Sequence, residues 1–198
     1  MTKYSKFALS ALVLGAFAFT SCSSDNNSVA AVDPNSIYGR LGGATLVDDP
    51  DNNDPAVKIE AGRLAYRSVV RTTVGLIVAD ITNGASGNLS AHFAPILAET
   101  GATQTTSLAR LEDNLTDFFS INTGATSAVN AYTGLDMVAA HNPAVNARMG
   151  ATSTNANYDK FEGYVGAAAV ANGVAANTQL YADIVVVLES LRDPIVQP

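Results

Sequence analysis

The chain has 198 residues, of which 47% are hydrophobic, and its formal net charge is −7. This length suits one domain, with room for an extension, that buries a substantial core. The 11 lysines and arginines form no cluster anywhere in the sequence. This argues against nucleic-acid binding, because neutralising phosphates needs grouped cations.

The chain opens with a pattern typical of a targeting segment. Lys3 and Lys6 precede an apolar run over 7–19, which is too short for a comfortable transmembrane helix. The sequence Phe-Thr-Ser-Cys that ends at Cys22 resembles the lipobox of bacterial lipoproteins. The resemblance implies that 1–21 is a signal peptide and that Cys22 is lipidated. The domain would then sit in the cell envelope, on the periplasmic face or the outer-membrane surface, held only by its lipid anchor. The alternative is an ordinary signal peptide with an incidental cysteine.

A polar stretch without periodicity follows, and we expect 22–35 to be a flexible tether before a folded domain over 36–198. The opening of that domain, Ser-Ile-Tyr-Gly-Arg-Leu-Gly-Gly at 36–43, predicts a short helical turn ended by glycine. Ile37 and Leu41 would face inward from this turn.

The next stretch alternates between loop and helix signals. The acidic, proline-bounded segment 48–55 predicts a loop, and 56–82 predicts a helix that Gly62 or Gly75 could divide. The glycine-rich segment 83–87 predicts a turn.

Helical spacing dominates the second half of the chain. Ser107 is the expected cap of a helix whose apolar positions repeat at three and four: Leu108, Leu111, Leu115, Phe118 and Phe119. Asn157 could cap a helix that Gly173 ends, and Asn177 could start a last helix that Pro194 stops. Strand-like alternation is absent, so the expected class is all-α.

One short helix presents a histidine at its end. Thr133 and Asp136 form a capping-box variant that would start this helix, and Pro143 would end it directly after His141. Met137 lies four residues before His141 and therefore on the same face. We expect a buried stripe of three apolar residues beside that face: Leu135, Val138 and Ala139.

Two of these segments resemble group 1 truncated haemoglobins. Chains of that family begin with Ser-Leu/Ile-Tyr-x-x-Leu-Gly-Gly, as 36–43 does, and the segment of His141 follows in the family's order. The resemblance covers about 36–43 and 76–196. It implies a truncated-globin-like helical sandwich with an inserted helical segment at about 44–70.

The resemblance also implies a cofactor, haem b, with His141 as the proximal iron ligand and a diatomic gas (oxygen, nitric oxide or carbon monoxide) as the bound ligand. The other expected haem contacts are Phe93, Leu111, Leu115, Phe118, Met137 and Ile77. His92 would be an exposed loop residue. The alternative is a haem-free globin-like module of the envelope that acts through interactions.

The expected distal side departs from the family, because Ile77 and Leu115 stand where many members place tyrosine and glutamine. A polar donor stabilises bound oxygen by roughly 1–3 kcal/mol. An apolar pocket therefore predicts weak oxygen retention, ready autoxidation and doubtful nitric oxide dioxygenation, unless Tyr66 re-enters the pocket. No hydrolase motif is present, and enzymatic activity beyond such weak redox chemistry is not indicated.

Overall fold

The computed structural model describes residues 30–197. The expected signal peptide and Cys22 lie outside the described residues and stay predictions. No helix of the described range is long and apolar enough to cross a bilayer. In chain order the elements are α1 (Ile37–Arg40), β1 (Leu46–Asp48), β2 (Lys58–Glu60), α2 (Ala61–Thr82), α3 (Ser90–Leu97), α4 (Gly101–Asn122), η1 (Ala128–Asn130), α5 (Met137–Ala140), α6 (Asn155–Ala171), α7 (Gln179–Ser190) and α8 (Arg192–Ile195).

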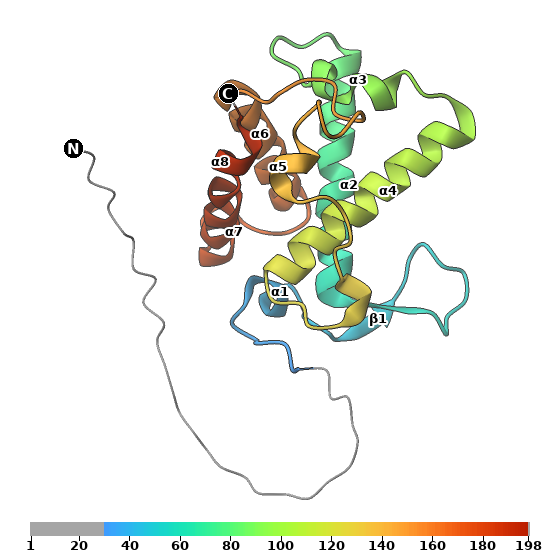
Figure 1. The fold of residues 1–198 in the computed structure, drawn as a ribbon. Coiled ribbons are helices and arrows are strands. Elements are labelled where there is room, and N and C mark those ends of the chain that lie inside the picture. Colours follow the sequence, from blue (N-terminus) through green and yellow to red (C-terminus); the bar gives the residue numbers. More distant parts are fainter. Residues whose placement is uncertain (1–29, 198) are drawn as a thin grey trace, which may run out of the picture.

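The helix α2 runs through the centre of the molecule (Figure 1) and packs against both α4 and α6. The helix α7 packs on α6 and reaches α1, and the short α5 packs against α8. The expected all-α class is confirmed in its coarse form, because the described residues are mostly helical, but they also contain a sheet of two short strands.

The first turn of the domain forms as expected. Ser36 caps α1 through its side chain, which accepts a hydrogen bond from the amide of Gly39 at 2.9 Å. Gly42 and Gly43 end the turn with φ values of 110° and 56°, which favour glycine. Ahead of the turn, Val32 already packs against a buried cluster formed by Tyr38, Tyr66 and Ala125.

The stretch between α1 and α2 contains no extra helix. The strands β1 and β2 pair antiparallel, with Leu46 opposite Glu60, and α2 begins at Ala61 rather than at Ala56. Side chains within 49–57 accept hydrogen bonds from amides two residues on, which stabilises turns in place of helix. The strands were missed because three residues are too few to show alternation.

Neither candidate glycine divides α2, which is continuous over 22 residues. A Cβ atom at Gly62 would lie 2.8 Å from the ring of Tyr38, so this glycine allows α1 to pack closely on α2. Gly75 has open space around its Cα atom and interrupts nothing.

The prediction that Ser107 caps the next helix is wrong. The helix α4 starts at Gly101, whose φ is 58°, and Ser107 lies inside it. Gln104 donates a hydrogen bond to the carbonyl of Ile96 at 3.2 Å, which ties the added first turn to α3. This contact between α3 and α4 accompanies a helix start that lies earlier than the local sequence predicts.

The remaining boundaries shift by a few residues. Thr154 caps α6 and Asn157 is its capping-box partner, while Thr178, not Asn177, caps α7. The expected end of α6 is confirmed, because Gly173 follows it with φ 91°. Pro194 does not stop the last helix but lies in the first turn of α8, where a missing N–H breaks no helical bond.

Candidate cofactor cavity

The helix that carries His141 is a single turn. Asp136 caps α5 by accepting a hydrogen bond from the amide of Ala139 at 2.9 Å, so the start expected at Thr133 is one turn too early. The end is as predicted, because His141 is the C-terminal cap and Pro143 follows two residues later.

The expected buried stripe on this helix is wrong. Leu135 is 46% exposed and Val138 is 49% exposed. The helix α5 packs against α8, and Met137, Ala140 and His141 line a cavity. A single turn has too few positions to bury a second face.

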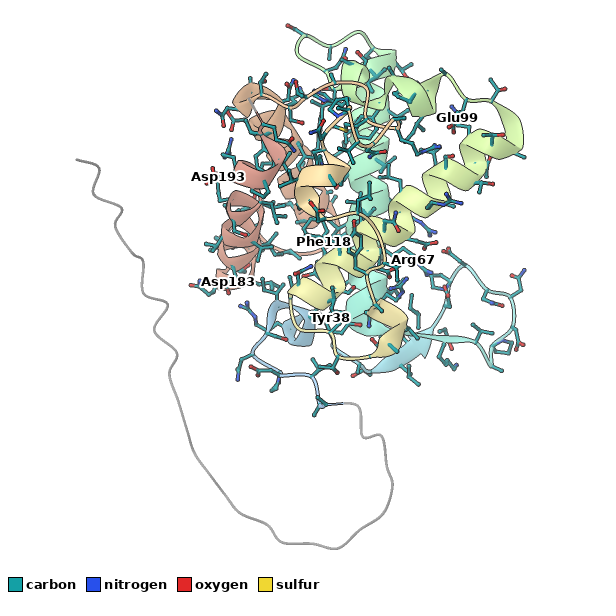
Figure 2. The ribbon with its side chains drawn as sticks, viewed as in Figure 1. Tyr38, Arg67, Glu99, Phe118, Asp183 and Asp193 are labelled. Atoms are coloured by element: carbon teal, nitrogen blue, oxygen red, sulfur yellow. The ribbon has the colours of Figure 1, made fainter. Side chains whose placement is uncertain are left out.

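That cavity has a volume of about 660 Å³, within the roughly 300–1,000 Å³ of typical cofactor pockets. The structure brings together on its wall every residue expected to contact haem: Ile77, Phe93, Leu111, Leu115, Phe118, Met137 and His141. These side chains come from four different helices and one helix cap. Figure 2 labels Phe118 on α4, near the middle of the molecule, where it meets Tyr132 edge-on.

The inner wall of the cavity is apolar. Ile77 is 3% exposed, and Leu111 and Leu115 add aliphatic surface from α4. Tyr66 does not join them: its hydroxyl donates to Thr123 at 2.6 Å, and its ring stacks on Tyr38 and Phe119. Tyr66 therefore does not provide the cavity with a hydrogen-bond donor.

Two arginines stand among the polar residues that line the cavity, Arg110 on α4 and Arg148 after α5. Both side chains are exposed. Arg148 pairs at 2.8 Å with Glu99, which lies in the connection between α3 and α4 and is labelled in Figure 2. Among residues 30–197, Arg110 is the one basic side chain without an ion pair. An unpaired cation at an apolar cavity suits a ligand with an anionic group.

The imidazole of His141 is held in one tautomer. Its Nδ1 atom lies 2.9 Å from the carbonyl oxygen of Met137. A carbonyl can only accept, so Nδ1 carries the proton and Nε2 keeps a free lone pair. Burial lowers the pKa of His141 below 6.5, the bond to Met137 opposes this shift, and the charge of His92 adds to it. The ring is therefore neutral at pH 7, as metal ligation requires.

His92 is not the exposed loop residue that we expected. It lies on α3 and is 7% exposed, and it lines the same cavity as His141. Its backbone carbonyl accepts from the amide of Gly150 at 3.0 Å, which fastens α3 to the segment after α5. The missed signal is the spacing of Leu89, His92, Phe93 and Ile96, which share one helical face.

The lowered pKa of His141 predicts a loss of stability in acid. Between its folded pKa and 6.5 the unfolded chain binds more protons, so the free energy of unfolding falls as pH falls through this window. Urea denaturation at about pH 7.5 and about pH 5 should therefore show a larger acid loss in the wild type than in His141→Gln. Equal losses in both proteins would contradict a buried neutral imidazole.

Residues 30–197 hold no group of three or more His, Cys, Asp or Glu side chains able to bind a bare metal ion. Haem iron, by contrast, needs only one or two axial ligands from the protein. Comparison with known proteins found no matching family model, no matching curated protein and no matching solved structure.

Proposed function

We propose that this chain binds haem b in the cavity beside α5, with Nε2 of His141 as the proximal iron ligand, and that it takes up a diatomic gas. The observation that carries the proposal is the bond from Nδ1 of His141 to the carbonyl of Met137, which leaves Nε2 unprotonated. A ligating histidine needs such an acceptor on its other nitrogen to fix its tautomer and orientation.

The residues around the cavity fit the group. Apolar side chains of α2 and α4 would cover the porphyrin faces and exclude water, and Arg110 could meet a propionate. Bound haem would supply an iron atom whose remaining position accepts a gas. The packing of α2 on α4 and of α6 on α7 also supports the truncated-globin-like sandwich, although two strands replace part of the expected helical insertion.

The apolar wall sets the chemistry we expect at the iron. Ile77 and Leu115 line the cavity and offer no hydrogen-bond donor to bound oxygen. Weak oxygen retention and relatively better binding of carbon monoxide or nitric oxide follow, as the sequence predicts.

Titration of the full-length chain with hemin, in detergent, tests the proposal. A sharp Soret band that saturates at one hemin per chain would support it. Broad absorption that rises without saturation would favour the haem-free interaction module instead.

Arg110 offers a specific test of how haem is oriented. We expect Arg110→Gln to weaken hemin binding about fivefold, because an exposed ion pair contributes at most about 1 kcal/mol. Hemin dimethyl ester, which lacks free carboxylates, should bind the wild type and Arg110→Gln alike. Lys58→Gln, a change on the distant β2 strand, is the matched control and should leave both affinities unchanged. A loss that is equal for hemin and its ester would contradict the carboxylate contact.

A further inference from the structure

The chain has two histidines, and both line the same cavity. His141 ends α5, whereas His92 comes from α3, nearly fifty positions earlier in the sequence. Only His141 has a role in the function proposed above.

The two imidazoles are held in the same way. Nδ1 of His141 lies 2.9 Å from the carbonyl oxygen of Met137, and Nδ1 of His92 lies 3.2 Å from that of Ala151. Each carbonyl can only accept a hydrogen bond, so each Nδ1 carries the proton. In the neutral form of either ring Nε2 then has a lone pair, which is the form that binds metals.

Nε2 of His92 forms no hydrogen bond with the described residues. The residue as a whole is 7% exposed, but Nε2 is not among the fully buried polar atoms that lack a partner, so this atom is open to the cavity that His92 lines. A donor role toward bound gas is excluded in this tautomer, because Nε2 carries no proton. A lone pair that is open to the cavity can instead bind a ligand there.

The position of His92 is firmly fixed. The amide of Gly150 donates to the carbonyl of His92 at 3.0 Å, and a Cβ atom at Gly150 would lie only 2.0 Å from the carbonyl oxygen of Ala91. This close approach needs glycine. The contact between Gly150 and α3 also holds the neighbouring Ala151 in place, and the carbonyl of Ala151 accepts the hydrogen bond from the His92 ring.

We propose that Nε2 of His92 is the second axial ligand of the haem iron held by His141, an inference that rests on the haem binding proposed above. Without gas the iron would then have two imidazole ligands. Carbon monoxide or nitric oxide would bind by displacing His92, so this residue would control gas affinity.

Electron paramagnetic resonance of the full-length chain, loaded with hemin and carrying no histidine tag, tests this inference. The ferric wild type should give a low-spin signal typical of two imidazoles, independent of protein concentration. His92→Gln and His92→Ala should shift to high spin and bind carbon monoxide at least about tenfold more tightly in the ferrous state, because no internal ligand competes. Met149→Leu, a change on the same cavity wall, is the matched control and should remain low-spin.

The outcomes separate the two proposals. A wild type that binds one hemin but is high-spin overturns the role of His92 and leaves that of His141 intact. A wild type that binds no hemin overturns both. If the His92 variants fail to fold, the wild-type signal still decides, since a concentration-independent pair of imidazoles can come only from His92 and His141.

Discussion

Replacing His141 with glycine should weaken hemin binding about a hundredfold or more, since loss of groups that merely orient a metal ligand already costs about tenfold to a hundredfold. The glycine leaves a gap where the ring stood, beside the carbonyl of Met137. Added imidazole can enter this gap and bind both the carbonyl and the iron. Hemin affinity of His141→Gly should therefore recover as imidazole is added, which absorption titrations would measure.

Met137→Leu is the matched control for that experiment. It keeps the apolar contact on the cavity and the backbone carbonyl, and it removes only the thioether sulfur. Hemin affinity should change little. If Met137→Leu loses the Soret band while His141→Gly keeps it without imidazole, the thioether rather than His141 would be the iron ligand.

Replacing Tyr38 with alanine should lower the free energy of unfolding by about 3–5 kcal/mol, the usual cost of truncating a fully buried aromatic side chain. Tyr38 is 0% exposed, stacks on Tyr66, and donates a hydrogen bond to the buried carboxylate of Glu60. Burial and this carboxylate raise the pKa of Tyr38, so the phenol keeps its proton. Urea denaturation in the absence of hemin measures the effect.

Two further variants show which part of Tyr38 matters. Tyr38→Phe keeps the ring and removes the hydroxyl, so it should cost about 1–2 kcal/mol. Glu60 then retains the amide of Asn130 at 2.7 Å as a donor. Val186→Ala, at a side chain that is 67% exposed, should change stability by less than about 0.5 kcal/mol. A Tyr38→Ala variant as stable as Val186→Ala would show that α1 does not belong to the cooperative core.

Local signals in the sequence predicted the elements whose boundaries depend on nearby residues. The turn at 36–43 ends in two glycines with positive φ, and the proline at 143 limits α5, as expected. Boundaries set by contacts between elements were not predictable. The bond from Gln104 ties the start of α4 to α3, and the pairing of β1 with β2 joins two three-residue strands across the loop between Asp48 and Lys58.

The residues expected around the haem come from helices with clear apolar faces, which is why their positions could be anticipated; their role toward haem stays a prediction. The resemblance to truncated haemoglobins identified these positions, and the fold places them around one cavity. The placement of His92 and Arg110 on the cavity wall was missed for physical reasons. The spacing of Leu89, His92, Phe93 and Ile96 indicates a shared face only if this segment is a helix, whereas His92 was expected in a loop. Whether an arginine is paired depends on which carboxylates the fold brings near.

The most direct measurement is a crystal structure of the full-length chain with hemin bound. The account predicts a porphyrin in the cavity between α4 and α5, with its iron bonded to Nε2 of His141 and Nδ1 of the same ring still on the carbonyl of Met137. A structure with hemin on the outer surface, or with the ring of His141 unbound to iron, would contradict it.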